Sequence, residues 1–372
     1  MPGYRIPWYS GYISHFQRPT APVVIPGPPR SPEHEEFIPP MDSDEEEPET
    51  QSISISMADM LHTIPAYRYR TNRKRWKHLP MYTEDLIQDM MEEEEKKYPT
   101  TVRIITWNVD FCTPNVKERL YTALRHIERE VLSCKEGDAP FDPCCILLQE
   151  VHAEVFPYLF EDEWVRRHFI ITPGSPSKWP ENAHYGNVTL VSKLLTVVKT
   201  QILHFGLSDM LRTALAVYVL LSEPEPSGEI VMICVVNTHL ESLPNGITQR
   251  PSQMLMASKF LKQTEVRGGV LAGDMNSIGP EDHNLHLEAQ LRDAWRKGDK
   301  EESGFTWGYQ EQDPGRLPPG RLDKILYLPR RGYKLDPPER IGIGLKTERG
   351  DWVSDHYGLD STLRLVARRN SR

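Results

Sequence analysis

The alternation of apolar and polar residues changes near residue 100, and from there on it is typical of β-structure. Short apolar runs, many of them rich in Val and Ile, recur between turn-forming residues, and their lengths are those of strands. These runs predict strands over Val102–Val109, Cys144–Leu148, Phe169–Thr172, Val188–Val191, Val197–Leu203, Thr213–Leu221, Ile230–Asn237, Gly269–Gly273, Leu322–Tyr327 and Leu359–Leu365.

Apolar residues at helical spacing predict helices between the strands. The expected helices are Asn115–Leu132, Val155–Trp164, Pro251–Gln263 and Asn284–Trp295, with an amphipathic one over Thr83–Lys97. Runs of strands with a few helices predict an α+β sandwich in which two packed sheets are flanked by helices.

The N-terminal part differs in composition. Its first 50 residues hold eleven of the 32 prolines and little apolar periodicity, so residues 1–60 are expected to be a disordered Pro-rich and acidic leader. Residues 61–100 are interpreted as a basic linker followed by the amphipathic helix. The folded, chemistry-bearing domain is then expected over residues 101–372.

Three short segments before residue 100 carry alternative interpretations. The acidic run Met41–Thr50 is typical of a solvated tail. The alternating segment Ile53–Met57 fits the same tail, but it also resembles a motif that binds a ubiquitin-like modifier by adding a strand. Arg68–Lys77 interleaves cations with aromatics, which is typical of a nuclear-localisation or nucleic-acid patch or of a solvated linker.

Charge and cysteine content narrow the class of protein. The formal net charge is −9, and the residues after 100 carry 33 basic and 36 acidic side chains, so a nucleic-acid substrate would need a local basic patch. The five cysteines show no CxxC spacing, and Cys144, Cys145 and Cys234 lie in apolar runs, as buried thiols of a reducing compartment would. Without a signal segment or an apolar run of membrane-spanning length, we expect a soluble intracellular protein.

Polar residues follow several apolar runs, where the edge of a sheet would deliver them into a cleft. Glu150 closes a run too apolar to be exposed, so we expect its carboxylate to be the direct ligand of a hard cation such as Mg²⁺. Asn108 and Asp110 share one face of another strand end. Asn108 is expected to orient Glu150 or a phosphate, and Asp110 to hold a water ligand of the cation.

Asp274 and Asn276 have the same i, i+2 spacing after the run Val270–Ala272. Asp274 is expected to take a proton from an attacking water, and Asn276 to fix that water or a substrate oxygen. The Gly-Asp-x-Asn segment alone could equally be a turn, but other segments of the chain place polar residues after apolar runs in the same way, and this favours the functional interpretation.

Two histidines complete the set. His356 is expected to donate to a phosphoryl oxygen, with Asp323 as the carboxylate that orients its ring, and His239 could be a second donor. Acids, amides and histidines gathered in this way predict a metal-dependent phosphodiesterase.

The segments TWNVD, LQE, NTHLES, GDMN, RLDKI and SDHYGL, in this order over about Val102–Leu365, resemble the endonuclease/exonuclease/phosphatase superfamily. This resemblance implies a DNase I-like four-layered α/β sandwich of two mainly antiparallel sheets and one catalytic Mg²⁺, with Mn²⁺ as a substitute. It agrees with the roles of Asn108, Glu150, Asp274 and His356. It gives supporting roles to Asp110, His239, Asn276 and Asp355, and we count Asp110 and Asp355 with the metal site.

Within the superfamily the chain resembles most the branch of 5′-tyrosyl-DNA phosphodiesterases. Arg250 and then Gln253 follow the THLES segment at a similar spacing, and Phe305-Thr306-Trp307 is similar to a substrate-facing aromatic motif. We therefore assign Ser242, Arg250 and Trp307 to substrate binding. The resemblance implies hydrolysis of 5′-phosphotyrosyl bonds left on DNA by a trapped type II topoisomerase, which places a monomeric repair enzyme in the nucleus, with the cytoplasm as a second compartment.

Other activities of the superfamily remain alternatives: abasic endonuclease, deadenylase and phosphoinositide phosphatase. A catalytically inactive scaffold that binds partners through the leader is the alternative outside enzymes. The chain departs from the family pattern after GDMN, where Ser277–Pro280 holds no basic residue, and its leader does not resemble a ubiquitin-binding helical domain. These departures concern DNA binding and the choice of partner more than the catalytic reaction.

Overall fold

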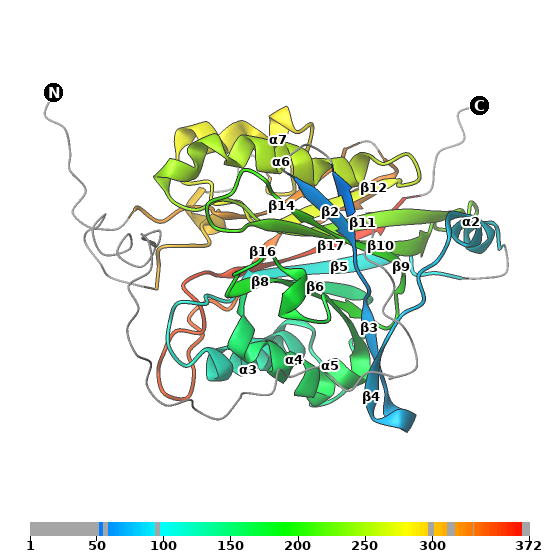
Figure 1. The fold of residues 1–372 in the computed structure, drawn as a ribbon, viewed down its shortest axis with the longest axis horizontal. Helices are drawn as coiled ribbons and strands as arrows, with labels where there is room; N and C mark the ends of the chain where they lie inside the picture. Colours follow the sequence, from blue (N-terminus) through cyan, green and yellow to red (C-terminus); the bar gives the residue numbers. More distant parts are fainter. Residues whose placement is uncertain are drawn as a thin grey trace, which may run out of the picture.

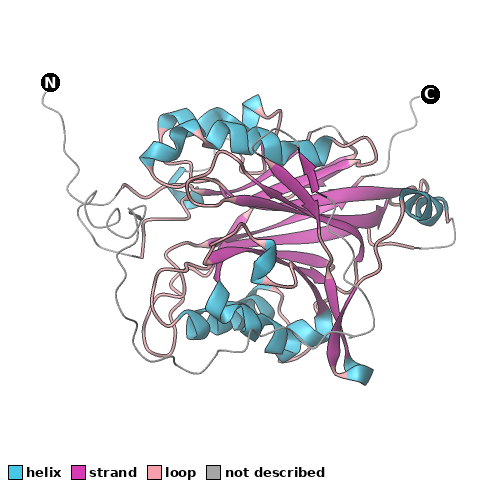
Figure 2. Ribbon diagram, in the orientation of Figure 1, coloured by secondary structure: helices cyan, strands magenta, loops and turns pink. Residues whose placement is uncertain are grey.

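Two β-sheets pack face to face and are covered on their outer faces by helices (Figures 1 and 2). The computed structural model describes residues 52–54, 59–93, 97–296, 301–310, 317–329 and 331–366. The predicted fold class is confirmed: both sheets are mixed but mainly antiparallel, since the β5–β6 and β11–β12 pairs are parallel and their other neighbours are antiparallel. None of the described helices is long and apolar enough to cross a membrane.

The eight-stranded sheet contains the longest buried strands. In spatial order its members are β1 (Ser52–Ser54), β2 (Met60–Thr63), β9 (Thr196–His204), β10 (Thr213–Ser222), β11 (Ile230–His239), β12 (Gly268–Asp274), β14 (Asp323–Tyr327) and β13 (Arg292–Asp293). All residues of β10, β11 and β12 are buried, because this sheet is covered on both faces.

The nine-stranded sheet packs against the eight-stranded one. Its order is β15 (Tyr333–Leu335), β17 (Gly358–Leu365), β5 (Thr101–Asn108), β6 (Cys144–His152), β8 (Tyr185–Ser192), β7 (Phe169–Thr172), β3 (Tyr67–Arg70) and β4 (Arg75–His78), with β16 (Glu339–Ile341) also paired to β17. Every strand predicted from the apolar runs is present in one of the two sheets, with ends shifted by a few residues at most.

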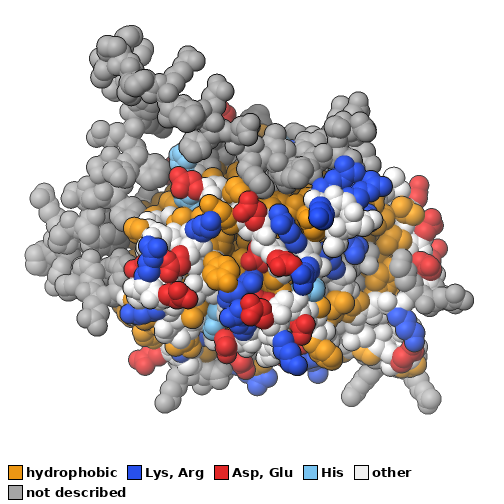
Figure 3. Space-filling view, turned by 90° about the horizontal axis from the view of Figure 1, so that it is seen from below, with side chains coloured by type: hydrophobic (Ala, Val, Ile, Leu, Met, Phe, Trp, Pro, Cys, Tyr) orange, Lys and Arg blue, Asp and Glu red, His pale blue; other side chains and the backbone are white. Residues whose placement is uncertain are grey.

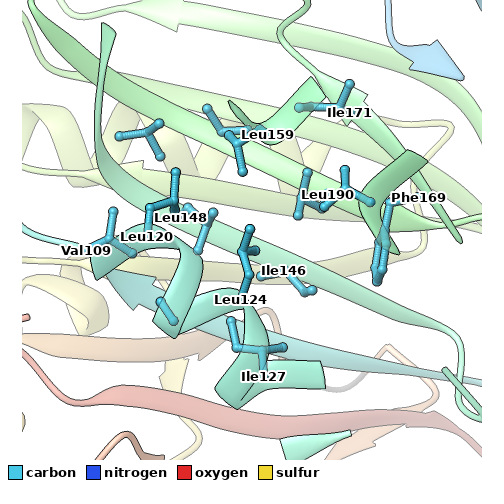
Figure 4. Packing of buried hydrophobic residues seen from close by; sticks show 14 of the residues in the cluster. Val109, Leu120, Leu124, Ile127, Ile146, Leu148, Leu159, Phe169, Ile171 and Leu190 are labelled. Atoms are coloured by element: carbon cyan, nitrogen blue, oxygen red, sulfur yellow. The ribbon is translucent and has the colours of Figure 1, made fainter. Parts of the chain in front are cut away.

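Three hydrophobic clusters correspond to the three interfaces between four layers. Side chains alternate across each strand with period two, so Ile146 and Leu148 of β6 face the helices whereas Cys145 and Leu147 face the other sheet. Figure 4 shows Ile146 and Leu148 packed against Leu120 and Leu124 under one helical layer. The cysteines predicted to be buried thiols are buried and free.

Two groups of helices cover the sheets. The nine-stranded sheet lies under α3 (Val116–His126), α4 (Phe156–Glu161) and α5 (Glu163–His168), and the eight-stranded sheet under α6 (Arg250–Ser258), α7 (Leu285–Glu288) and α2 (Glu84–Glu92) (Figure 1). Short π or 3₁₀ turns extend or link them: η2 (Thr71–Arg73), η3 (Ile127–Val131), η4 (Ala153–Val155), η5 (Pro176–Lys178), η6 (Pro244–Thr248), η7 (Lys259–Lys262), η8 (Pro280–Asn284) and η9 (Glu301–Gly304).

Two helix predictions need correction. The helix predicted over Val155–Trp164 is divided at Asp162, whose extended backbone ends α4 and whose side chain accepts a hydrogen bond from Val165 N to begin α5. The helix predicted over Asn284–Trp295 ends after α7, because Gln290 has a left-handed backbone (φ +58°) and the next residues form β13.

Residues 60–78 belong to the sheets, which corrects their interpretation as a linker. Strand β2 pairs with β9 of one sheet, and β3 pairs with β7 of the other. Alternation here was too short to be recognised, because each strand has four residues. Most of the predicted leader lies outside the described residues, as do residues 55–57 of the segment Ile53–Met57; the backbone of Ser52–Ser54 pairs with β2.

Candidate active site

Strand ends of both sheets meet at one end of the sandwich and carry the predicted polar residues. In the eight-stranded sheet the register pairs His239 with Asp274 and Asp274 with Asp323, so three site residues stand side by side. The nine-stranded sheet contributes Asn108 from the end of β5, and its Nδ2 donates to Asp274 Oδ2 at 3.1 Å. The site therefore spans the interface between the sheets.

Asp274 lies at the centre of this group. Its Oδ1 accepts a hydrogen bond from Asn276 N at 2.9 Å, and its Oδ2 lies 3.3 Å from His239 Nε2 and 3.8 Å from His356 Nε2. Burial alone would raise the pKa of Asp274, but the two histidines hold it below its usual range. The group is an ionised carboxylate with a donor on either side.

His356 is oriented by Asp323. Its Nδ1 lies 2.7 Å from Asp323 Oδ2, which makes Nδ1 the donor and turns Nε2 toward Asp274. Burial would lower the pKa of His356, but nearby carboxylates, that of Asp323 first, raise it well above its usual value. This environment favours the protonated form of the His356 ring, and the expected contact between these two residues is present.

His239 has the opposite electrostatic environment, set by Arg212. The Nη1 of Arg212 lies 2.9 Å from His239 Nδ1, and Nη2 donates to Ser242 Oγ at 2.6 Å. Burial, assisted by Arg212, lowers the pKa of His239 to about 4. Sequence reasoning missed Arg212, because it precedes a strand in no recognisable motif; a lone arginine before a buried apolar run was the only signal.

Glu150 projects from an irregular point of β6. The β6–β8 register shifts between Leu148 and Val151, and Glu150 has φ +59°. Its Oε2 accepts a hydrogen bond from Phe111 N at 3.1 Å, and its Oε1 lies 3.8 Å from His239 Nε2. The pKa of Glu150 is raised to about 7, by burial first, and the carboxylates of Asp355 and Asp110 add to the rise.

A divalent cation fits beside Glu150 for an electrostatic reason. After burial, the carboxylates of Asp355 and Asp110 raise the pKa of Glu150, and Asp110 adds to the raised pKa of Asp355; a hard cation with oxygen ligands removes that repulsion. Asp110 and Asp355 are already engaged: Asp110 Oδ1 accepts from Cys112 N, and Asp355 Oδ2 accepts from Trp307 Nε1. We therefore expect Glu150 as the direct ligand, with the other two acids reached through water.

A second group could also hold a metal on distance alone. Among the described residues, Asp274, Asp323 and His356 place one ligand atom each within 4.8 Å of one another. However, Asp323 occupies Nδ1 of His356, and the raised pKa of His356 favours a proton on Nε2, where a cation would need the lone pair. This group is better suited to proton and phosphate chemistry.

Asn276 and Asp110 shape the loops of the site. Asn276 Nδ2 donates to Leu240 O at 3.0 Å, and the residue has φ +48°. Asp110 Oδ2 lies 3.4 Å from Arg119 Nη1. These contacts give both residues a positioning role and leave the roles proposed for them toward water as predictions.

The assignment of Arg250 to substrate is wrong. The side chain is 1% exposed and donates to both carboxylate oxygens of Asp282, at 2.7 and 3.0 Å, while Nη1 donates to the carbonyls of Glu241 and Leu243. Four of its five N–H donors are used, and the buried guanidinium is out of reach of a phosphate. Arg250 instead fixes the loop after β11, which contains Ser242.

Trp307 and Ser242 border the site. Trp307 is partly exposed, its Nε1 donates to Asp355 Oδ2 at 3.1 Å, and its backbone forms a bridge with His356. Ser242 accepts from Arg212. Gln149 Nε2 donates a hydrogen bond to Asn237 Oδ1 at 2.8 Å, which joins the two sheets. This contact was not predicted from the sequence.

Comparisons with known proteins agree with this geometry. A sequence model described as the endonuclease/exonuclease/phosphatase family matches residues 105–356. The crystal structure of D. rerio TDP2 complexed with single strand DNA product superposes with a TM-score of 0.55 at 22% identity, over 71% of this chain and 99% of that chain. Truncated Caenorhabditis elegans TDP2 gives 0.54 at 19% identity, over 71% and 97%. These structures share the fold. No curated protein sequence matches the chain.

Proposed function

The chain belongs to the endonuclease/exonuclease/phosphatase family, and we propose that it is a Mg²⁺-dependent phosphodiesterase that hydrolyses 5′-phosphotyrosyl bonds on DNA. One observation carries the proposal: the Asp274 carboxylate lies between the ring nitrogens of His239 and His356, beside the carboxylate of Glu150. Phosphodiester hydrolysis needs a group that orients water and donors for phosphoryl oxygens, and this arrangement provides both.

Each residue then has a part in one displacement. Asp274 orients the attacking water and accepts its proton as the new O–P bond forms. The protonated His356 and the N–H of His239 donate to the phosphoryl oxygens, whose negative charge grows in the transition state. Asn108 holds Asp274 by its 3.1 Å hydrogen bond. The bond from phosphorus to the tyrosyl oxygen breaks, and the phenolate departs.

The cation and Glu150 account for the remaining requirement. A bound Mg²⁺ would polarise a phosphoryl oxygen and acidify water, which compensates for the low basicity of Asp274. Glu150 would hold the cation, while Asp110 and Asp355 would orient its water ligands. Mn²⁺ has similar oxygen preferences and is expected to substitute.

The choice of substrate rests on Trp307 and on the relatives. Trp307 offers a flat, partly exposed face next to His356, where a base of a 5′ single-stranded end can stack. The D. rerio relative is described in complex with a single-strand DNA product, which supports DNA as the substrate class. A nuclear repair role for a monomer follows from this proposal, and a ubiquitin-like partner for Ile53–Met57 stays a separate prediction.

A substrate panel tests the proposal. Purified enzyme with Mg²⁺ would be given 5′-tyrosyl DNA, abasic duplex, poly(A) and a phosphoinositide, and we expect 5′-tyrosyl DNA to be cleaved fastest. A p-nitrophenyl ester of thymidine 5′-monophosphate reports the metal-dependent chemistry alone. If the ester is cleaved but another member of the panel is cut faster than 5′-tyrosyl DNA, the substrate assignment is refuted and the phosphodiesterase activity stands. If the ester is not cleaved, the alternative of a catalytically inactive scaffold is favoured.

Trp307→Ala refines the test. This variant is expected to weaken DNA substrates by about 1–3 kcal/mol, the usual loss of one stacking contact, and to affect the small ester less. Trp352, which lies under Lys346 Nζ at 4.4 Å, offers a matched control. Trp352→Ala should leave the ratio of the two activities unchanged.

A further inference from the structure

The hairpin β3–β4 separates aromatic from cationic side chains. Its register places Tyr69 opposite Trp76, Arg68 opposite Lys77 and Arg70 opposite Arg75. Because side chains alternate between the faces of a strand, the aromatic pair lies on one face and the four cations on the other. This segment precedes residues 105–356, which match the family model.

The aromatic face fixes the hairpin to the protein. Trp76 is 1% exposed, packs edge-on against Phe160 with ring centroids 4.9 Å apart, and donates from Nε1 to Phe160 O at 3.1 Å. Arg166 lies over the Tyr69 ring at 5.1 Å. The cationic face is therefore held in one orientation by packing on α4 and α5.

The cationic face is unusually rich in charge. The turn between the strands adds Arg73 and Lys74, and no Asp or Glu occurs anywhere from residue 60 to 83. Lys193 lies close enough for Arg68 and Arg70 to lower its pKa, after burial, to about 8. Figure 3 shows Lys and Arg atoms gathered at the upper right of the molecule, at the horizontal position of β3 and β4 in Figure 1.

The register gathers these cations on one side of a hairpin that packing holds in place, and such a surface is complementary in charge to a polyanion. We propose that the cationic face of β3–β4, which we define as Arg68, Arg70, Arg73, Lys74, Arg75 and Lys77, is a docking surface for the phosphate backbone of duplex DNA, separate from the candidate active site. It would supply a local basic patch to a chain whose net charge is negative.

The separation from the cleft follows from the register. Arg68 pairs with Ile170, which pairs with Val191 near the end of β8, whereas Tyr185 at the start of β8 contacts Arg212 of the site. The hairpin thus lies toward the end of the sheet opposite the active site. Contacts here would hold flanking DNA without reading its sequence, because phosphates carry no base information.

Direct binding tests the inference without turnover. The full chain, in EDTA, would be titrated with a fluorescent 20-base-pair duplex that has no tyrosyl group, and anisotropy would be recorded over a range of salt concentrations. We expect Arg68→Gln/Arg70→Gln to weaken binding about tenfold at low salt and to reduce the slope of log K against log salt by about 2, one for each phosphate contact. Because EDTA removes catalysis, failure of the proposed activity would leave this result unaffected.

A matched control exists at the other edge of the same sheet. Lys334 and Arg364 are also exposed cations opposite each other across antiparallel strands, β15 and β17. Lys334→Gln/Arg364→Gln changes the charge equally and is expected to keep wild-type affinity and slope. Equal losses in both double variants would overturn the inference, because the effect would then be one of net charge.

A second readout separates DNA docking from nuclear import. The Arg68→Gln/Arg70→Gln variant could keep its affinity for duplex DNA while a fluorescent fusion of it loses nuclear accumulation. That result would show that the segment is an import signal and would overturn the proposed docking surface. The milder Arg68→Lys/Arg70→Lys variant keeps the charge and should keep the slope, which guards against an effect of misfolding. Thermal melting of the Arg68→Gln/Arg70→Gln variant should be unchanged or higher, since removing cations relieves repulsion.

Discussion

The guanidinium of Arg212 lies 2.9 Å from Nδ1 of His239 and thereby fixes which ring nitrogen of that histidine carries the proton. Arginine can only donate, so Nδ1 must accept and Nε2 must carry the hydrogen. Nε2 lies 3.3 Å from Asp274 Oδ2. A residue that sequence reasoning did not identify therefore sets the protonation state of one that it did.

Arg212→Met is expected to raise the pKa of His239 above about 4, because the neighbouring cation that opposes protonation is lost, while burial, the larger cause of the low pKa, remains. The variant also loses the donor that fixes the ring proton on Nε2. We expect the rate to fall by at least ~100-fold, and the acidic limb of the pH–rate profile to move to higher pH. NMR titration of the ring checks the pKa. Met210→Leu, which alters only the sulfur contact of Arg212, is the control; an unshifted pKa in Arg212→Met would contradict the prediction.

Glu150→Gln should abolish Mg²⁺-dependent turnover and weaken Mg²⁺ binding measured by calorimetry. It removes the charge of the expected ligand and keeps its shape. The variant should be at least as stable as the wild type, since repulsion with Asp110 and Asp355 is relieved. Glu154→Gln, at an exposed site four residues on, should leave both properties intact. Near-normal turnover in Glu150→Gln would show that Glu150 is not the metal ligand.

Asp274 and His356 are expected to act as a unit, because their side chains serve one step and lie 3.8 Å apart. Each Ala variant should lose at least ~100-fold in rate. The double variant should lose less than the product of the single losses, which single-turnover kinetics can measure. Losses that multiply fully would show that the two residues do not share a step.

Arg250→Met should destabilise the protein by about 3–5 kcal/mol, because it leaves the Asp282 carboxylate buried without its partner. Arg250→Met/Asp282→Leu should recover much of this loss. Denaturant unfolding measures both. If Arg250→Met instead retained its stability and lost DNA affinity, the original assignment of this residue to substrate would be restored.

Lys324 provides a pH-dependent prediction. Burial lowers its pKa to about 8, well below the 10.5 of an unfolded lysine. Between these values the unfolded chain binds more protons than the folded one, so stability should rise with pH from about 8 to 10. Lys324→Met should flatten that rise and stabilise the protein at pH 7, which thermal melts at pH 7 and pH 9.5 can test. A rise of the same size in the variant would assign the effect to other groups.

The positions of the strands followed from the sequence because a strand buried on both faces must be apolar along its whole length. Phe169–Thr172 is the clearest case, with its predicted ends equal to those of β7. The pairing of His356 with Asp323 could also be predicted, because a histidine donor needs an acid that fixes its tautomer, and Asp323 lies in a predicted strand. The prediction of a helix over Asn284–Trp295 was wrong because helical spacing does not reveal a residue with left-handed backbone, such as Gln290.

Tertiary structure alone decided the roles of the two arginines. Arg250 has the spacing of a substrate residue, but spacing fixes where a side chain begins and not which acceptor it reaches; Asp282, 32 residues away, binds it. Arg212 has no motif, yet the antiparallel pairing of β10 with β11 brings it to His239. Apolar burial is a property of each residue and its near neighbours, so the sequence determines it. The partner of a charge is set by contacts distant in the chain, which exist only once both sheets have formed.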